Sequence, residues 1–290
     1  MPSLKEIKTR IHSVKSSRKI TSAMMMIASS KLVRMQKVIT NLYPYEQKMN
    51  QLMTLLIGSE NENPSPLVEK REVKRVSIVV FSPNTGLIGK FNADLISYLR
   101  TVVDGYRKTG VAEIQLYAIG NKIREGALKL GFEHLKDFRA IADKPTYENS
   151  QQLAQELMDA FLNRETDEVL LIYHHFKSKS VQELVAETFL PISTDKMNDN
   201  QRVSSQTDYI VEPDRQTVVE MLIPKSLKLK LYTAHVDAVA SEHAARTIAM
   251  QTAVDNADEL MDELTLQYNK LRQQSITNEL LDIIGGSFGR

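Results

Sequence analysis

The chain of 290 residues contains no cysteine and no tryptophan, and only 11 of its residues are glycine. The absence of cysteine excludes disulfides, thiol catalysis, thiol redox switching and cysteine-ligated zinc or iron–sulfur sites. The sequence also lacks the run of 18 apolar residues that a membrane-spanning helix needs. Hydrophobic residues make up 42% and charged residues 25% of the chain, which is ordinary for a folded globular protein and excludes wholesale disorder.

The formal net charge is only +1, but the charges are unevenly distributed. Residues 1–40 carry nine basic side chains and a single acid, Glu6, so this segment is +8 and the remaining 250 residues are −7. The basic residues are Lys5, Lys8, Arg10, Lys15, Arg18, Lys19, Lys31, Arg34 and Lys37. A basic, serine-rich start is also typical of a mitochondrial transit peptide, but the apolar pattern of this segment continues far past any plausible cleavage point.

A regular apolar pattern runs through the first 56 residues. Starting at Leu4, positions spaced alternately three and four residues apart are apolar at thirteen of sixteen places, and the exceptions are Arg18, Thr21 and Glu46. A stripe with a mean spacing of 3.5 residues is typical of a coiled-coil seam, because only supercoiling keeps such a stripe facing one partner. These sixteen positions are called the seam below.

The ends of this first helix can be read from the sequence. Ser3 followed by Glu6 is a capping box that starts a helix. Pro44 is expected to bend the helix or loosen one turn, and Gly58 with the polar stretch 59–66 is expected to end it. The predicted helix has about 55 residues and a length of roughly 80 Å, which is more than a globular core needs.

A second long helix is predicted at the other end of the chain. Between Pro224 and Ile284 there is no further proline and no glycine, and Gly285 and Gly286 are expected to stop the helix after about 60 residues. Small residues, which let two helix backbones approach closely, dominate its first half. They are Ala234, Ala238, Ala240, Ser241, Ala244, Ala245, Ala249, Ala253 and Ala257. Farther on lies an apolar stripe made of Ala257, Leu260, Leu264, Tyr268 and Leu271, which shifts phase to Ile276, Leu280 and Ile283.

The two predicted helices have complementary charges. Residues 241–290 carry eight acids and four bases, a charge of −4, opposite in sign to the first helix. Two long helices of opposite charge at opposite chain ends favour an antiparallel pair over self-association. The alternative, in which the two helices pack separately on the middle of the chain, stays open. A domain of the remaining size does not cover 80 Å of apolar stripe, so the pair is expected to protrude and to meet another protein.

The middle of the chain has a different period. Short, nearly continuous apolar runs are typical of strands buried on both faces, and they occur at 76–81, 114–119 and 169–173. Helical patterns lie at 92–108, 121–130 and 149–162, an edge strand is expected at 182–189, and a polar loop at 193–208. Alternating strands and helices favour a largely parallel, Rossmann-like α/β sheet. The sequence therefore divides into a helix at 1–58, an α/β domain at 73–210 and a helix at 211–290, which is an α/β fold with a long antiparallel coiled coil.

The turn after the first strand does not fit a nucleotide site. Its segment 82–92 contains Gly86 and Gly89, but Phe91 stands where a phosphate loop needs Ser or Thr, and Asn84 stands where it needs its first glycine. The dinucleotide spacing GxGxxG is absent as well. Gly86 and Gly89 are therefore interpreted as residues of a structural turn that glycine makes possible.

No catalytic or metal motif stands out elsewhere. The six histidines show no metal-ligand spacing, and the match of 285–289 to a nucleophile elbow has no strand before it and no histidine after it. The sequence therefore predicts a protein without catalytic residues, cofactor or metal of its own.

The two chain ends and the first turn carry a resemblance to one family. The segments 7–15 (IKTRIHSVK) and 19–32 (KITSAMMMIASSKL) look like the N-terminal signature of the gamma subunit of the F-type ATP synthase, the central shaft of a rotary motor. The C-terminal signature is matched by Glu242-His243, Arg246, Ala249-Met250, Ala253 and Asn256-Ala257, then by Tyr268-Asn269, Arg272-Gln273, Ile276-Thr277 and Glu279. The segment 86–92 (GLIGKFN) resembles the GLCG-type turn of the family, with Ile88 where cysteine is common. The similarity covers the whole chain in order.

The resemblance implies a function and a set of contacts. It implies a coiled coil inside a hexamer of alternating alpha and beta subunits, whose rotation drives the beta catalytic sites through different conformations. Arg272, Gln273 and Thr277 resemble the family's polar contacts to beta-subunit loops, and Met24 with the basic face of Lys15, Arg18, Lys19 and Lys31 is expected near acidic beta loops. The α/β domain is expected beside the epsilon subunit and the membrane c-ring. The implied location is the cytoplasmic side of a bacterial plasma (inner) membrane, reached only through the complex, with no homo-oligomer.

Three other functions are consistent with parts of the sequence. A structural coiled-coil adaptor with an α/β head would lack the paired end motifs and would self-associate. An enzyme built on the α/β domain would bind ATP or NAD through residues 73–223. A nucleic-acid-binding protein would use the basic first helix, although an acidic helix of the same chain is available to that charge.

Overall fold

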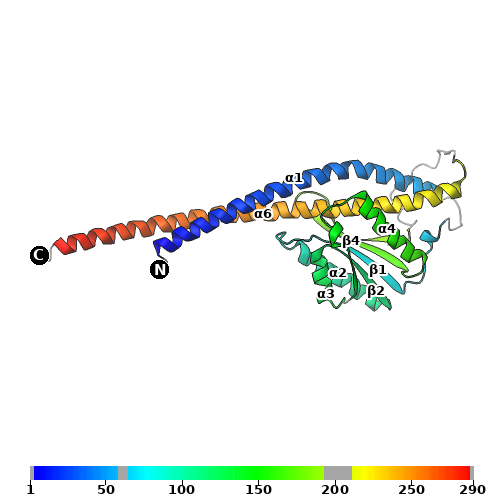
Figure 1. Ribbon diagram of the computed structural model, residues 1–290, viewed down its shortest axis with the longest axis horizontal. Coiled ribbons are helices and arrows are strands. Elements are labelled where there is room, and N and C mark those ends of the chain that lie inside the picture. Colours follow the sequence, from blue (N-terminus) through cyan, green and yellow to red (C-terminus); the bar gives the residue numbers. More distant parts are fainter. Residues whose placement is uncertain (1–2, 58–64, 133, 193–210, 288–290) are drawn as a thin grey trace. The chain divides into compact units, whose positions relative to one another are not determined.

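A computed structural model describes residues 3–57, 65–132, 134–192 and 211–287 (Figure 1). The chain divides into two compact units. The terminal unit contains Met1–Ser29 and Arg246–Arg290, and the central unit contains Ser30–Ala245. The two long helices, α1 (Leu4–Ile57) and α6 (Arg215–Ser287), each contribute to both units. Among the described residues, no helix is long and apolar enough to cross a bilayer.

Helix α1 forms as the sequence predicts. The capping box is present: the Ser3 N–H donates to Glu6 Oε2 at 2.9 Å, and the Glu6 N–H donates to Ser3 Oγ at 3.3 Å. The helix continues without a break through Pro44 and ends at Ile57, next to the predicted stop. Every one of the sixteen seam positions is buried or half-buried, whereas most residues between them are exposed. The predicted seam of α1 is therefore confirmed.

Helix α6 has 73 residues and is longer than the predicted length of about 60. It begins at Arg215, because Asp214 caps it: the Thr217 N–H donates to Asp214 Oδ1 at 2.9 Å. Pro224 lies inside the helix and does not start it. The start at Arg215 lies inside the predicted segment 211–290, but the length of about 60 residues counted from Pro224 was too short, because a single proline removes one helix hydrogen bond, a loss that the packing of the surrounding turns outweighs.

Helix α6 also runs past the predicted stop. It continues through Gly285 and Gly286 to Ser287, so the prediction that these glycines end the helix was wrong. Glycine ends a helix by adopting the left-handed backbone conformation, and in a helical conformation it only lowers stability by about 1 kcal/mol relative to alanine. Both residues are helical here.

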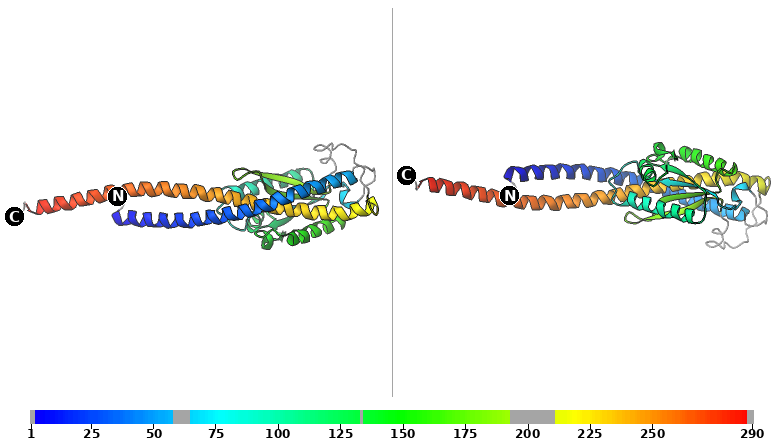
Figure 2. Two further views of the ribbon diagram at one scale, coloured as in Figure 1. Left: turned by 90° about the horizontal axis from the view of Figure 1, so that it is seen from above. Right: turned by 90° about the horizontal axis from the view of Figure 1, so that it is seen from below.

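In the terminal unit, α1 and α6 lie side by side and run antiparallel (Figures 1 and 2). The inner face of α6 in this unit alternates steps of four and three residues, and its members are buried or half-buried. They are Met250, Val254, Ala257, Met261, Leu264, Tyr268, Leu271 and Ser275. The predicted stripe included Leu260, which is 40% exposed, so it was one residue out of phase at that point. The last residues of α6 extend past the first residues of α1 (Figures 1 and 2).

The central unit contains a five-stranded sheet with the order β3-β2-β1-β4-β5. Its strands are β1 (Arg75–Phe81), β2 (Glu113–Ile119), β3 (Leu135–Asp137), β4 (Glu168–Phe176) and β5 (Gln182–Leu190). The first four are parallel, and β5 pairs antiparallel with β4 as an edge strand. The predicted Rossmann-like class and the predicted edge strand are confirmed.

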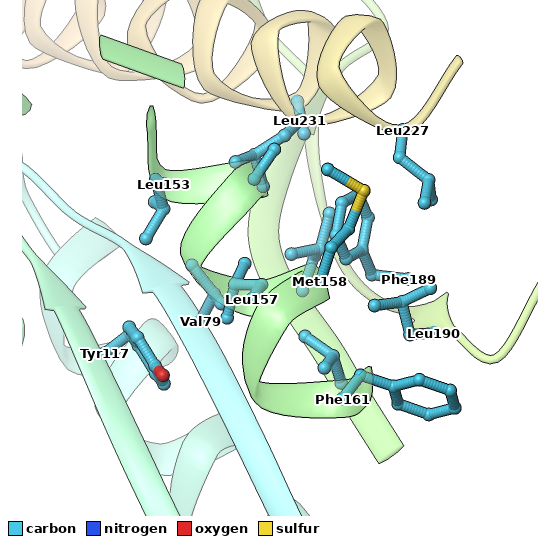
Figure 3. Close-up of a cluster of buried hydrophobic side chains, with 14 of the residues drawn as sticks. Val79, Tyr117, Leu153, Leu157, Met158, Phe161, Phe189, Leu190, Leu227 and Leu231 are labelled. Atoms are coloured by element: carbon cyan, nitrogen blue, oxygen red, sulfur yellow. The ribbon is translucent and has the colours of Figure 1, made fainter. Parts of the chain in front are cut away.

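Helices cover both faces of this sheet. Alternate residues of β1 point to opposite faces, because a strand has a period of two. Val76, Ile78 and Val80 pack with α2 (Phe91–Lys108) and α3 (Asn121–Lys129). Val79 and Phe81 pack with α4 (Tyr147–Leu162) and α6. Figure 3 shows this second layer, in which side chains of α4 such as Leu157 and of α6 such as Leu231 belong to one buried cluster with Val79 of the sheet.

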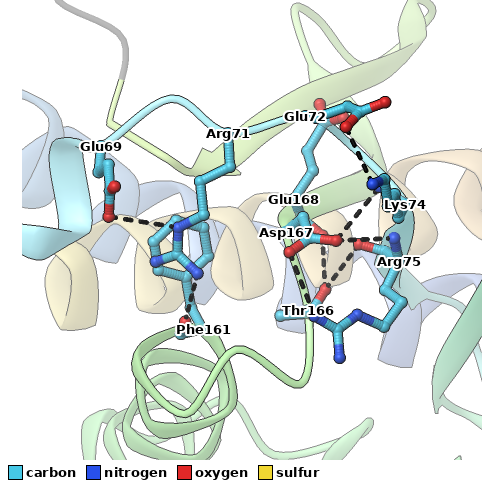
Figure 4. A network of polar contacts seen from close by, with 9 residues as sticks. All are labelled: Glu69, Arg71, Glu72, Lys74, Arg75, Phe161, Thr166, Asp167 and Glu168. Carbon is cyan, nitrogen blue, oxygen red and sulfur yellow. Dashed lines mark hydrogen bonds and ion pairs between the residues drawn. The ribbon is translucent and has the colours of Figure 1, made fainter.

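A polar network holds the starts of β1 and β4 together (Figure 4). The Asp167 carboxylate accepts the backbone N–H groups of Arg75 at 2.9 Å and Lys74 at 3.2 Å. Burial opposes the ionised form of Asp167, but these hydrogen bonds prevail and lower its pKa. Arg71 lies over the Phe161 ring and donates to the Phe161 carbonyl, which attaches the chain before β1 to α4.

Three short elements have no counterpart among the predictions. They are β3 and two 3₁₀ helices, η1 (Pro66–Val68) and η2 (Arg139–Ile141). Each has three residues, which is too short to show a hydrophobic period. The predicted polar loop at 193–208 lies outside the described residues.

Candidate partner-binding surfaces

The end of α6 exposes a group of large apolar side chains. Its residues 272–284, called the tip, are all exposed except Ser275. The exposed fractions are 46% for Ile276, 54% for Leu280, 60% for Leu281, 69% for Ile283 and 52% for Ile284. A soluble protein rarely exposes such a contiguous apolar group unless another molecule covers it.

The tip also contains the three polar residues that the family resemblance selected. Arg272, Gln273 and Thr277 are exposed on α6, within about one and a half turns. The Thr277 hydroxyl donates to the Gln273 carbonyl at 2.9 Å, four residues back along the helix. Their role as contacts to a partner stays a prediction.

Helix α1 presents a second exposed surface in the terminal unit. Lys15 and Lys19 are exposed and lie one turn apart, and Met24 is 41% exposed. Three apolar residues near them are not among the predicted contacts: Ile20, Met26 and Ile27 are 60%, 61% and 59% exposed. The sequence feature that could have predicted this surface is that these apolar residues lie outside the seam. Lys31, which is exposed in the central unit, continues the set along the helix.

Arg18 has an intramolecular partner. Its guanidinium binds the Asp258 carboxylate of α6 with two hydrogen bonds, from Nε to Oδ1 and from Nη2 to Oδ2, the second at 2.9 Å. The hydrogen bond and the charge of Asp258 raise the pKa of Arg18. A bidentate pair fixes the relative position of two helices better than a single contact. Arg18 interrupts the apolar seam because it joins α1 to Asp258 of α6 by an ion pair.

The usual ligand position of an α/β sheet is filled in the central unit. The strand order reverses between β1 and β4, and open sheets of this kind bind ligands at the carboxyl ends of the strands there. Here His235, Val239 and Glu242 of α6 line that place. The remaining cavity has a volume of about 10 Å³, which is room for roughly one water molecule. No nucleotide fits at this place.

The two histidines at this cavity are held neutral. Burial lowers the pKa of His174 to about 4, although Asp94 opposes the shift, and His174 stacks on the Phe91 ring at 3.6 Å between centroids. Burial also lowers the pKa of His235 to about 4, against a hydrogen bond with the Ala142 carbonyl. The described histidines and acids form no group of three or more that could hold a metal ion.

The turn after β1 has two residues with a left-handed backbone. Gly89 has a φ of 57°, and Leu87, which is 66% exposed, has a φ of 63°. Gly86 has no such φ, and a methyl group there would meet no atom within 4 Å. Backbone conformation therefore favours glycine at position 89 and does not require it at position 86.

Comparison with known proteins gives a consistent picture. A family model described as ATP synthase matches residues 3–288. The chain is 50% identical to the ATP synthase gamma chain of Phocaeicola vulgatus over 287 residues, covering 99% of each chain. It is 51% identical to the gamma chain of a Bacteroides fragilis strain, again covering 99% of each, and 41% identical to that of Flavobacterium johnsoniae, covering 99% and 98%.

Solved structures share the fold at lower identity. A chain of the Euglena gracilis mitochondrial ATP synthase, in an OSCP, F1 and c-ring assembly, is similar with a TM-score of 0.69 and 19% identity, over 98% of this chain and 93% of that one. A chain of the rotor of the same enzyme has a TM-score of 0.65 and 17% identity, over 94% and 98%. At these identities the likeness concerns the fold.

Proposed function

The chain belongs to the ATP synthase gamma-chain family, and on this premise we propose that it is the central shaft of a rotary ATP synthase. In this function its helix pair occupies the middle of a hexamer of alpha and beta subunits. Rotation of an asymmetric shaft then changes the beta subunits in turn, and the chemistry takes place on them and not on this chain. The family resemblance extends the proposal to an epsilon subunit and a membrane c-ring beside the sheet.

The observation that carries this proposal is the exposed tip. The α1 seam and the inner face of α6 are covered within the chain, yet the tip leaves five large apolar side chains 46–69% exposed. An apolar surface at the end of a helix pair fits a partner that surrounds it, because the exposed residues lie on more than one side of the helix: Leu280 and Leu281 are adjacent, and so are Ile283 and Ile284.

The helix pair has the properties that a shaft requires. A continuous seam and the Arg18–Asp258 pair join α1 and α6 in the terminal unit. Its outer surface on α1 combines exposed bases such as Lys15 and Lys19 with apolar groups such as Ile27. Basic groups are attracted by acidic loops, and scattered apolar contacts allow movement without a deep binding pocket. The proposed location is the cytoplasmic face of a bacterial plasma membrane, reached through the complex.

Co-expression with the alpha and beta subunits of the same organism tests the proposal. We expect a stoichiometric complex with ATPase activity to copurify with this chain. Copurification of the alpha and beta subunits alone, with this chain left soluble and folded, would refute the proposal.

A charge-neutralising variant refines the test. K19Q/K31Q removes two exposed bases of α1 and is expected to weaken coupling of ATP hydrolysis to rotation without changing the melting temperature of the chain. The matched control is K37Q/K48Q, which removes two exposed bases of the same helix outside the implied contact. Equal effects of both variants would show that only the total charge matters.

A further inference from the structure

Glu46 is the one acidic residue of the α1 seam. It is half-buried in the central unit, where its carboxylate faces charged groups of two other elements. Glu187 of β5 and Asp237 of α6 are acidic neighbours, and Lys230 of α6 is the basic one. A carboxylate at a seam position costs stability unless its charge is compensated.

The acidic neighbour on α6, Asp237, is fully engaged in contacts with other groups. Asp237 is 2% exposed and accepts three hydrogen bonds or ion-pair contacts. Its Oδ2 atom lies 2.6 Å from His175 Nδ1 and 3.2 Å from the Tyr43 hydroxyl, and Oδ1 accepts the Phe176 N–H at 2.8 Å. Asp237 therefore joins α1, β4 and α6, and of the three described residues that bind its carboxylate only His175 can carry a positive charge.

The basic neighbour of Glu46 is shared with another acid. Lys230 Nζ lies 2.8 Å from Glu187 Oε1 and also donates to the Thr188 carbonyl at 3.1 Å. The Tyr173 hydroxyl donates to Glu187 Oε2 at 3.3 Å. Lys230 therefore compensates one of the two carboxylates beside it, and the second keeps an unbalanced charge.

With its three carboxyl groups ionised, the cluster has a negative charge balance. Its acids are Glu46, Glu187 and Asp237, and its bases are Lys230 and, when protonated, His175. Lys177 and Glu183, which are more exposed to solvent, form an ion pair with each other, so their charges cancel. The tyrosines Tyr43 and Tyr173 stay neutral donors, because burial first and the nearby acids second raise the pKa of each. One carboxylate therefore lacks a cation even when His175 carries a proton.

We propose that Glu46 is a proton-binding switch at the junction of α1 with β5 and α6. A proton on Glu46 removes the excess negative charge, so that α1 packs tightly in the central unit. Loss of the proton as the pH rises restores the repulsion from Glu187 and Asp237 and loosens that packing. In the proposed shaft, the attachment of α1 to the sheet would then depend on pH. This consequence rests on the proposed function. The proton-binding site itself does not depend on the proposed function.

The position of the titration supports this switch. Burial first, and then the charge of Glu187, raise the pKa of Glu46 from 4.5 to about 7, while Lys230 and the Thr233 hydroxyl oppose the shift. Because the pKa is higher in the folded chain than in the unfolded chain, the stability that Glu46 contributes is complete below about pH 4.5 and is lost as the pH rises through 7.

Thermal unfolding of the full chain between pH 5.5 and 8.5 tests the switch. We compare the wild type with E46Q at each pH, so that the titration of other groups cancels. The wild type should melt below E46Q already at pH 5.5, because Glu46 is ionised in the unfolded chain there, and the gap between the two melting temperatures should widen by roughly 3–5 °C between pH 5.5 and pH 8.5. The charge-matched control is E46Q/Q47E, which moves the carboxylate to an exposed position next to it and should behave as E46Q does.

A second measurement needs no variant to fold. The full chain labelled with ¹³C at the glutamate side-chain carboxyl is titrated by NMR, and one carboxyl resonance should have its midpoint near pH 7. If every glutamate carboxyl titrates between about pH 4 and 5, or if the wild type and E46Q differ by the same melting temperature at every pH, the switch is refuted.

Discussion

Leu264 and Leu281 distinguish the two roles expected of apolar residues in α6, which are packing within the chain and binding to partner subunits. Both are leucines of the terminal unit, but Leu264 is 3% exposed on the inner face and Leu281 is 60% exposed on the tip. Leu264→Ala should lower the free energy of unfolding of the chain by about 2–5 kcal/mol, because it removes a buried side chain and leaves a cavity. Leu281→Ala should change that free energy by less than about 0.5 kcal/mol, because the site is exposed and alanine is a good helix former.

Binding to the alpha and beta subunits should show the opposite order. Burying a whole leucine side chain gains about 1.5–3 kcal/mol, and 60% of the Leu281 side chain is still exposed to be covered. Leu281→Ala should therefore cost about 1–2 kcal/mol of binding, which is a roughly 5- to 30-fold weaker complex. The assays are denaturant unfolding of the free chain and titration of the labelled chain with the hexamer. If Leu281→Ala lowers stability and leaves binding unchanged, the assignment of the tip as a partner surface is wrong.

Three further sets of variants test the structure itself. Arg18→Ala and Asp258→Ala should each destabilise the helix pair, and the double variant should lose less free energy of unfolding than the sum of the two single losses. A double-mutant cycle of unfolding measures this difference. Strictly additive losses would contradict the ion pair. Gly89→Ala should lower stability by about 1–2 kcal/mol because of its left-handed backbone alone. Gly120→Ala should lower stability clearly more. Its φ is 104°, and its added methyl group would also clash with the carbonyl oxygen of Ser82. Burial lowers the pKa of His235 to about 4, so the unfolded chain binds a proton that the folded chain does not, and stability should fall between pH 6.5 and 4 by up to about 3 kcal/mol. His235→Gln should lose that part of the pH dependence, and an unchanged slope would refute it.

The long-period pattern made α1 the best-predicted element. Its seam repeats over the whole helix, so local exceptions did not change the prediction, and even Glu46 lies on the buried side. What the sequence could not show is why Arg18 and Glu46 are exceptions. That depends on side chains far away in the chain, Asp258 for one and Glu187 with Lys230 for the other.

The first half of α6 shows how tertiary packing removes a sequence signal. Residues 233–244 are all buried, because α1 covers one side of this segment and the sheet with its helices covers the other. A helix buried all round has no apolar face to detect, and its polar residues bind the end of β4, as Ser241 does by donating to the His174 carbonyl at 2.8 Å. The small residues predict a seam toward one partner helix, whereas this segment packs against both α1 and the sheet with its helices.

The partner surfaces could be predicted only in part. Arg272, Gln273 and Thr277 came from the family resemblance, because an exposed polar residue on a helix has no signal of its own. The exposure of Ile276, Leu280 and Ile283 could not be predicted, since the same residues would be buried if α1 reached as far along α6. Only the structure shows that α6 extends past α1 in the terminal unit (Figure 2).

Rotation of the chain inside the assembled hexamer tests the central claim most directly. Because the chain has no cysteine, Lys108→Cys on the exposed end of α2 provides a single attachment point for a bead. With the alpha and beta subunits fixed to a surface, addition of ATP should make the bead turn continuously in one direction. A complex that contains this chain in stoichiometric amount and hydrolyses ATP at its full rate while the bead stays still would contradict the account.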